Sequence, residues 1–147
     1  MPYVHPDRRM NRGGSVADYD DDLPVMHAAG VRAVVCLLNI PTDAPVFEFA
    51  GFEFLCLPVP DGGVPSWDQA EQFVQFVNAQ LAAGKPVAVH CEAGLGRTGT
   101  MLALFLIFRG ATAKDAIQCV RNVERVAIET ASQIRFLEEY ATRRQSF

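Results

Sequence analysis

The segment 85–109 constrains the fold of this chain more than any other part of the sequence. Residues 85–89 form a short apolar run typical of a buried strand, and residues 98–109 form a longer apolar run typical of a buried helix. The residues between these runs must therefore turn the chain from a strand into a helix. Gly94 and Gly96 lie in this turn, and because they lack a Cβ atom they permit backbone angles that aim successive N–H groups at one anion.

The composition of this turn suits a reactive cysteine beside a bound anion. Cys91 follows the predicted strand, and the start of the next helix contributes a partial positive charge near its sulfur. These surroundings favour the thiolate and make the cysteine a nucleophile near neutral pH. Arg97 offers a planar pair of donors that matches two phosphate oxygens, and the Thr98 hydroxyl can donate to the sulfur. The turn therefore predicts a cysteine nucleophile in an anion-binding loop.

The full string is also similar to a known signature. It reads His90-Cys91-Glu92-Ala93-Gly94-Leu95-Gly96-Arg97-Thr98 and resembles the His-Cys-x-x-x-x-x-Arg-Thr/Ser motif of the protein tyrosine phosphatase superfamily. Its detail is similar to small atypical dual-specificity phosphatases, especially the kinase-associated phosphatases. The resemblance implies a phosphatase that hydrolyses phosphate monoesters on protein Tyr and Ser/Thr through a phosphocysteine intermediate. It implies phosphate-binding roles for Glu92, Ala93, Gly94, Leu95, Gly96 and Arg97.

A candidate proton donor follows another predicted strand. Asp61 lies in Pro60-Asp61-Gly62-Gly63-Val64-Pro65, and the same family resemblance implies that it is a general acid on a mobile loop. The alternative is structural, since Pro-Asp-Gly is a strong turn signal and Asp often bonds its own backbone in turns. Ligands gather at the carboxyl ends of parallel strands, so we expect Asp61 and Cys91 at the same sheet edge.

Two further residues have both a catalytic and a structural interpretation. His90 precedes the nucleophile, where its ring could bond the loop backbone and, if charged, favour the thiolate; the alternative is a satisfied core histidine. Gln133 resembles the glutamine that positions the hydrolytic water in tyrosine-specific phosphatases. Thr130 and Gln133 also have the spacing of an ordinary helix-capping box, so both interpretations of Gln133 stay open.

The rest of the chain alternates between strand and helix patterns. We predict strands over 31–38, 52–59 and 85–89, and helices over 18–29, 66–84, 98–109, 112–123 and 130–143. Residues 1–15 are predicted as an irregular arm or short edge strand, and residues 39–50 as a connection punctuated by proline. This pattern favours one α/β domain over 1–147, a three-layer sandwich whose mainly parallel central sheet is flanked by helices.

Composition narrows the class of protein and its partners. The formal net charge is -4, so the chain lacks the excess of basic side chains that is typical of nucleic-acid-binding proteins. We expect neither a signal peptide nor membrane insertion. The four cysteines show no paired spacing, and three of them fall in apolar runs, which predicts core thiols in a reducing cytoplasm. The three scattered histidines give no metal-ligand spacing, so no metal or cofactor is expected. If Cys36 or Cys56 lies beside Cys91, a peroxide-driven disulfide is a further hypothesis.

Several functions remain open at this point. Residues 92–96 contain one acid and no lysine, which favours a single phosphate on a phosphorylated protein over a polyanionic head group. The main alternative is a phosphoinositide or other small-molecule phosphatase. A rhodanese-like sulfurtransferase and an inactive phosphate-binding module are the remaining alternatives. Nucleoside triphosphate binding is not supported, because no lysine follows the second glycine.

Overall fold

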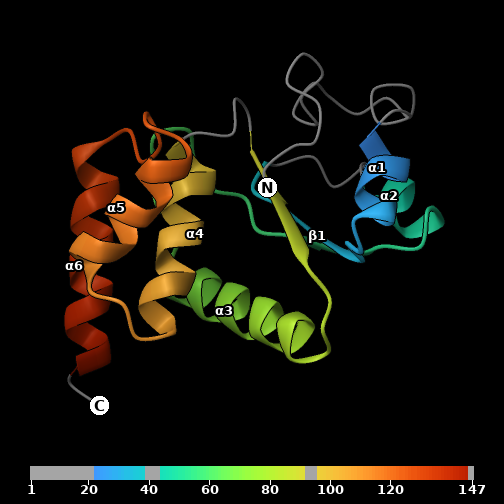
Figure 1. Cartoon of the computed structure of the whole chain (residues 1–147). Coiled ribbons are helices and arrows are strands. Elements are labelled where there is room, and N and C mark those ends of the chain that lie inside the picture. Colours follow the sequence, from blue (N-terminus) through green and yellow to red (C-terminus); the bar gives the residue numbers. More distant parts are fainter. Residues whose placement is uncertain (1–21, 39–43, 92–95, 146–147) are drawn as a thin grey trace.

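The computed structural model describes residues 22–38, 44–91 and 96–145 (Figure 1). The strands are β1 (Ala33–Cys36), β2 (Glu53–Cys56) and β3 (Val87–His90). The helices are α1 (Asp22–Ala28), α2 (Ala44–Phe49), α3 (Trp67–Ala82), α4 (Gly96–Phe108), α5 (Ala113–Val123) and α6 (Ala131–Gln145). The predicted arm over 1–15 and the start of the predicted helix 18–29 lie outside the described residues.

The sheet is parallel, with β1 at its centre. Its three strands follow the order β2-β1-β3, and Cys36 at the end of β1 is in register with Cys56 on one side and His90 on the other. All described strands therefore end at one edge of the sheet. The chain segments that carry Asp61 and Cys91 leave the sheet at this edge, as predicted.

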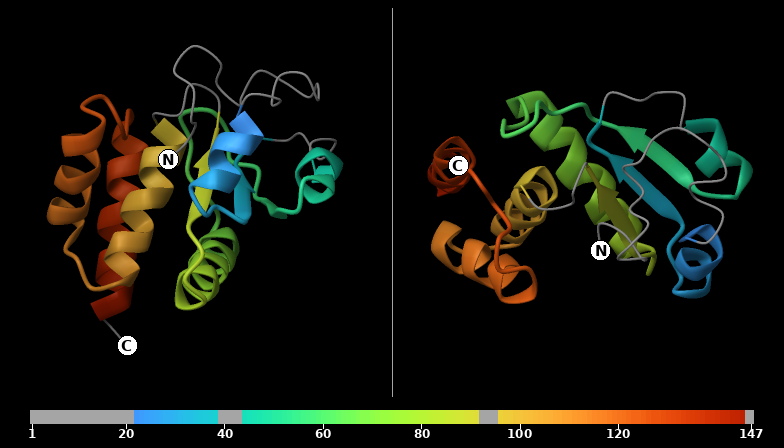
Figure 2. Two further views of the ribbon diagram at one scale, coloured as in Figure 1. Left: turned by 45° about the vertical axis from the view of Figure 1, so that its right-hand side comes forward. Right: turned by 90° about the horizontal axis from the view of Figure 1, so that it is seen from above.

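Helices cover both faces of the sheet, which confirms the predicted sandwich (Figure 2). One face packs on α1 and α2 through a small cluster that includes Val34, Ala88 and Phe47. The other face packs on α3 and α4, and the larger core there includes Val35 and Val89. Helices α5 and α6 pack against the far side of α4. The central β1 and β3 residues are buried on both faces, which explains their continuous apolar runs.

Local signals in the sequence explain where several helices begin. Ser66 caps α3: its Oγ accepts a hydrogen bond from the N–H of Gln69, and the Gln69 side chain accepts one from the N–H of Ser66. This reciprocal capping box is the predicted one. Thr112 caps α5 by accepting from the N–H of Asp115. The structure confirms, to within a few residues at each end, the helices predicted over 66–84, 98–109, 112–123 and 130–143, and it confirms the end of the helix predicted over 18–29.

The connection predicted over 39–50 contains a helix, α2, so that prediction is wrong in part. Phe47 on α2 is fully buried and stacks on Phe54 of β2, with ring centroids 5.2 Å apart. It also meets the ring of Phe52 edge to face at 6.3 Å. The helix has only six residues, too few to show helical periodicity, and its conformation is explained by this tertiary packing.

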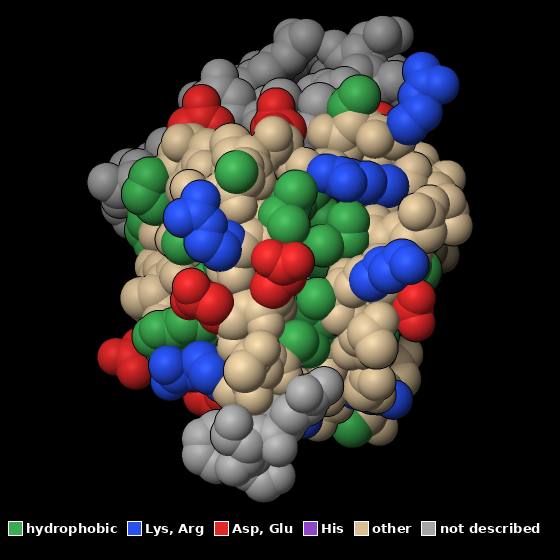
Figure 3. Space-filling view, turned by 90° about the vertical axis from the view of Figure 1, so that its left-hand side faces the viewer, with side chains coloured by type: hydrophobic (Ala, Val, Ile, Leu, Met, Phe, Trp, Pro, Cys, Tyr) green, Lys and Arg blue, Asp and Glu red, His purple; other side chains and the backbone are tan. Residues whose placement is uncertain are grey.

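The face formed by α5 and α6 carries mixed charge (Figure 3). Side chains of Lys or Arg are interspersed there with those of Asp or Glu, and apolar side chains are exposed between them. A groove with a volume of about 440 Å³ lies between the start of α3 and the side of α6. Of the helices that the structure describes, none is long and apolar enough to cross a bilayer.

Candidate active site

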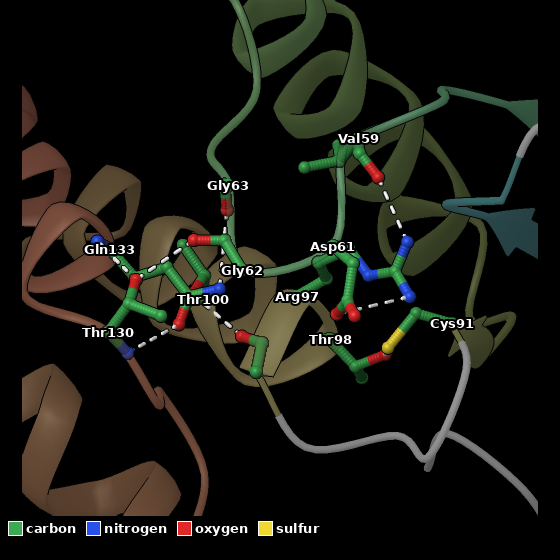
Figure 4. A network of polar contacts seen from close by, with 11 residues as sticks. Val59, Asp61, Gly62, Gly63, Cys91, Arg97, Thr98, Thr100, Thr130 and Gln133 are labelled. Carbon is green, nitrogen blue, oxygen red and sulfur yellow. Dashed lines mark hydrogen bonds and ion pairs between the residues drawn. The ribbon is translucent and has the colours of Figure 1, made fainter.

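Cys91 lies directly after β3 and is buried, with 3% of its surface exposed. The hydroxyl of Thr98, in the first turn of α4, donates a hydrogen bond to Cys91 Sγ over 2.9 Å (Figure 4). The α4 N-terminus therefore approaches the sulfur, so a hydroxyl donor and the positive end of the helix dipole both lie beside it. The predicted pairing of Thr98 with Cys91 is present.

Arg97 reaches from the same turn of α4 toward the loop that follows β2. Its Nη1 donates to the Val59 carbonyl oxygen over 3.0 Å, and its Nη2 lies 3.7 Å from Asp61 Oδ1. Arg97 is 7% exposed, whereas the Asp61 side chain is 92% exposed. Because water screens the carboxylate, this ion pair contributes little to stability. Asp61 is therefore accessible to a ligand, and Arg97 is held by its hydrogen bond to the Val59 carbonyl oxygen.

The loop that carries Asp61 is fastened by its backbone. The Gly62 carbonyl oxygen accepts from Thr130 Oγ1 over 3.0 Å, and the Gly63 carbonyl oxygen accepts from Gln133 Nε2 over 3.2 Å (Figure 4). Gly62 has a φ of 72°, a left-handed conformation that suits glycine. The turn interpretation of Pro-Asp-Gly is thus correct for the backbone, and the Asp61 carboxylate remains available for chemistry.

Gln133 makes the capping box that its spacing predicts. Its Oε1 accepts from the N–H groups of Glu129 and Thr130 over 2.8 and 3.1 Å, and its own N–H donates to Thr130 Oγ1 over 3.2 Å. Gln133 is also fully buried beside the start of α4: a methyl group added at Gly96 would lie 3.2 Å from Gln133 Nε2. The structural interpretation is therefore present, and the water-positioning role stays a prediction.

His90 is a buried, neutral histidine. It is 1% exposed, and burial lowers its pKa to about 4, so the ring carries no charge near neutral pH. The ring packs against that of Phe47 at a centroid distance of 6.1 Å. Among the described residues neither ring nitrogen has a hydrogen-bond partner. His90 thus lies buried next to Cys91, as predicted. Its neutral imidazole does not supply the positive charge by which a histidine could stabilise a thiolate directly.

The structure describes only the end of the predicted phosphate-binding loop. Glu92, Ala93, Gly94 and Leu95 lie outside the described residues, so their predicted role stays a prediction. Gly96 is buried and opens α4, where its carbonyl oxygen accepts from Thr100 Oγ1 over 2.7 Å. A methyl group there would collide with a carboxylate oxygen of Glu129. A larger residue at position 96 would therefore require the Glu129 side chain to move.

Three residues near the site were not predicted from the sequence: Gly99, Arg121 and Glu129. Gly99 lets α4 approach the segment that contains Ala127 closely, since a methyl group at position 99 would lie 2.9 Å from the Cβ of Ala127. Arg121 donates to two carbonyl groups of the segment 127–130, and Glu129 lies against Gly96. A glycine within the strongly helical run of α4 was the available signal for close packing. No local pattern in the sequence indicates the contacts of Arg121 or Glu129.

The remaining cysteines occupy different environments. Cys36 is buried and Cys56 half-buried, and both donate to the Leu38 carbonyl oxygen, over 3.6 and 3.1 Å. Cys119 is exposed on α5, so the core-thiol interpretation does not extend to all four cysteines. Cys36 is in register with His90, one residue before Cys91. The disulfide hypothesis stays a prediction.

Together, the parallel sheet, the buried cysteine at the end of β3 and the arginine in the first turn of α4 define a small dual-specificity-type member of the protein tyrosine phosphatase superfamily. Residues 9–111 match the family model described as "Polymorphic toxin system, DSP-PTPase phosphatase", and the chain belongs to this family. The class inferred from the signature string is thereby confirmed.

Individual proteins agree with this assignment. The chain is 37% identical over 113 residues to human protein tyrosine phosphatase type IVA 3; the alignment covers 76% of this chain and 65% of the human protein, just under two thirds of its length. The structure is similar to that of Tk-PTP in its active form, with a TM-score of 0.77, 31% identity and coverage of 90% and 89% of the two chains. Kinase-associated phosphatase, at 18% identity and a TM-score of 0.78, shares the fold over 99% of this chain and 84% of its own.

Proposed function

We propose that this protein is a cysteine-dependent phosphatase that hydrolyses phosphate monoesters on protein Tyr and Ser/Thr. One observation carries the proposal. At one sheet edge, the Cys91 sulfur accepts a hydrogen bond from Thr98 in the first turn of α4, and Arg97 in the same turn pairs with the Asp61 carboxylate over 3.7 Å. A nucleophile, an anion-binding fork and a proton donor are the three groups that thiolate-mediated ester cleavage requires.

In the first step the Cys91 thiolate attacks phosphorus in line with the ester oxygen. The S–P bond forms as the P–O bond breaks, and Asp61 gives its proton to the departing oxygen. Arg97 and the backbone N–H groups of the loop after Cys91, over Glu92, Ala93, Gly94, Leu95 and Gly96, hold the equatorial oxygens. The product of this step is a phosphocysteine and a free hydroxyl compound.

In the second step water hydrolyses the phosphocysteine. Asp61, now a carboxylate, takes a proton from the water as its oxygen attacks phosphorus, and the S–P bond breaks to return the thiolate. Thr98 stabilises that thiolate through the 2.9 Å hydrogen bond to Sγ. Gln133 is proposed to orient the water through Nε2. The capping box uses Oε1, and Nε2 donates one of its two N–H groups to Gly63, which leaves the other for the water.

The charges around the site favour substrates with a single phosphate. Asp61 is exposed beside Arg97, and the Glu129 carboxylate lies against Gly96, so a second phosphate group would meet negative charge. The net charge of -4 and the mixed charge of the α5 and α6 face support a protein substrate and not nucleic acid (Figure 3). We place the protein in a reducing cytoplasm, where a catalytic thiol stays reduced.

The first experiment measures hydrolysis of 4-nitrophenyl phosphate in the presence of a metal chelator. We expect phosphate release by the wild type, none by Cys91→Ser, and a kcat about 100-fold lower for Asp61→Asn. Asp68→Asn, which changes an exposed carboxylate in the first turn of α3, is the matched control and should keep wild-type kcat. Equal rates in the wild type and Cys91→Ser would sink the proposal.

A second experiment addresses the substrate. Phosphotyrosine and phosphoserine peptides are compared with phosphoinositide vesicles at equal phosphate concentration. Higher kcat/KM for the peptides supports the phosphoprotein class, and higher kcat/KM for the vesicles would establish the phosphoinositide alternative. Formation of thiocyanate from thiosulfate and cyanide, without phosphatase activity, would instead indicate a sulfurtransferase.

A further inference from the structure

Arg121 lies on α5, outside the signature loop, and its guanidinium is directed at the backbone of another segment. Its Nε donates to the Ala127 carbonyl oxygen over 3.0 Å, and its Nη2 donates to the Ile128 carbonyl oxygen over 2.8 Å. Two adjacent carbonyl groups are thus held by one planar fork. An arginine that spans two acceptors fixes orientation as well as distance, which a lysine cannot do.

The segment that Arg121 holds has an unusual backbone. Ile128 has a φ of 62°, and it is the one residue other than glycine with a positive φ among those that the structure describes. A β-branched residue resists this conformation, so neighbouring contacts must maintain it. The Ile128 side chain is 1% exposed, and its N–H lies against Gly99 of α4. Packing on one side and Arg121 on the other therefore hold the turn in place.

This turn leads directly into the residues that fasten the loop of Asp61. Gly62 is the residue after Asp61, and its carbonyl oxygen accepts from Thr130 Oγ1. The carbonyl oxygen of Gly63 accepts from Gln133 Nε2 (Figure 4). Both donors depend on the course of the chain just before α6. The contacts thus form a continuous series from Arg121 through Ile128 and Thr130 to the backbone beside Asp61.

We propose that Arg121 is a positioning residue for the general acid: it holds the Ala127 and Ile128 carbonyl groups so that Thr130 keeps the Asp61 loop over Cys91. This inference rests on the proposed phosphatase function and on Asp61 as its acid. Arg121 touches neither the phosphate nor the reacting sulfur in this account. Its loss therefore weakens proton delivery and leaves the nucleophile and Arg97 in place.

Substrates with different leaving groups separate this role from a general effect on folding. A poor leaving group such as the phenolate of phenyl phosphate needs the acid, whereas the weakly basic nitrophenolate of 4-nitrophenyl phosphate needs it less. For Arg121→Gln we expect kcat on phenyl phosphate to fall about tenfold and kcat on 4-nitrophenyl phosphate to fall about twofold or less. A loss of folded enzyme would lower both rates by the same factor.

Two further variants act as controls. Arg125→Gln removes the same charge from an exposed position four residues along the chain and should leave both rates unchanged. Arg121→Lys keeps the charge but loses the fork, and we expect an intermediate loss that again is larger on phenyl phosphate. Thr130→Val, which removes the donor to Gly62, should reproduce the selective loss of Arg121→Gln.

The double variant Arg121→Gln/Asp61→Asn tests the route of the effect. If Arg121 acts through Asp61, the double variant is no slower on phenyl phosphate than Asp61→Asn alone. Equal losses on both substrates, multiplicative losses in the double variant, or failure of both Arg121 variants to fold would overturn the inference. A wild type without phosphatase activity would instead overturn the proposed function, which keeps the two failures distinguishable.

Discussion

At the scale of single residues, the site depends on how burial and partners set the chemistry of each side chain. Cys91 is buried yet accepts a hydrogen bond from Thr98, while Asp61 is exposed, lies 3.7 Å from Arg97 and precedes Gly62, whose carbonyl group accepts from Thr130. The proposed nucleophile is thus fixed and the proposed acid is accessible. His90, beside the nucleophile, contributes packing and no positive charge at neutral pH.

Thr98→Ala tests the role of the hydroxyl on the sulfur. In the proposed mechanism Thr98 stabilises the departing thiolate, so its loss should slow hydrolysis of the phosphocysteine and lower kcat on the order of a hundredfold. Stopped-flow measurement with 4-nitrophenyl phosphate should then show a burst of nitrophenol before slow turnover. Thr98→Ser keeps a hydroxyl and should retain most of the activity. Unchanged turnover in Thr98→Ala would contradict this assignment.

The buried His90 predicts a dependence of stability on pH. Its folded pKa of about 4 lies below the unfolded value of 6.5, so the unfolded state binds more protons between these values and stability falls as pH falls through that window. Between pH 7 and pH 5 this group alone should cost about 2 kcal/mol. Urea unfolding of wild type and His90→Asn at both pH values isolates the contribution. The exposed His27 provides the control, and His27→Asn should keep the wild-type dependence.

At the scale of elements, α4 packs closely against the segment before α6, and this contact holds the first turn of α4 in place. Gly99 permits this approach, because a methyl group there would lie 2.9 Å from the Ala127 Cβ and 3.2 Å from the Ile128 nitrogen. The backbone nitrogen cannot move without disturbing the turn that Arg121 holds. The helix and the turn thus form one supporting unit.

Gly99→Ala should therefore destabilise the protein by about 1–3 kcal/mol, since the added methyl group overpacks this contact. Urea denaturation gives the free energy of unfolding directly. The double variant Gly99→Ala/Ala127→Gly removes the opposing methyl group and should recover part of that loss. If the single variant were as stable as the wild type, the contact would be looser than the distances indicate.

At the scale of the whole molecule, the sequence predicted the parallel α/β sandwich and the position of Asp61 and Cys91 at one sheet edge, because parallel strands all end at the same edge. It also predicted the pairing of Thr98 with Cys91 and the capping box of Gln133, which are fixed by local spacing. Helix α2 and the contacts of Arg121 were not predictable, since they arise from packing between segments distant in sequence.

The way the acid loop is fastened has a consequence for synthesis of the chain. The hydrogen bonds from Thr130 to Gly62 and from Gln133 to Gly63 join residues 68 and 70 positions apart. During translation Asp61 therefore emerges long before Thr130 and Gln133, which hold its loop. A nascent chain that has exposed Cys91 but not Gln133 would carry the proposed nucleophile without a held proton donor. Catalytic competence would then appear only once α6 has been made, and shorter nascent chains would be inactive.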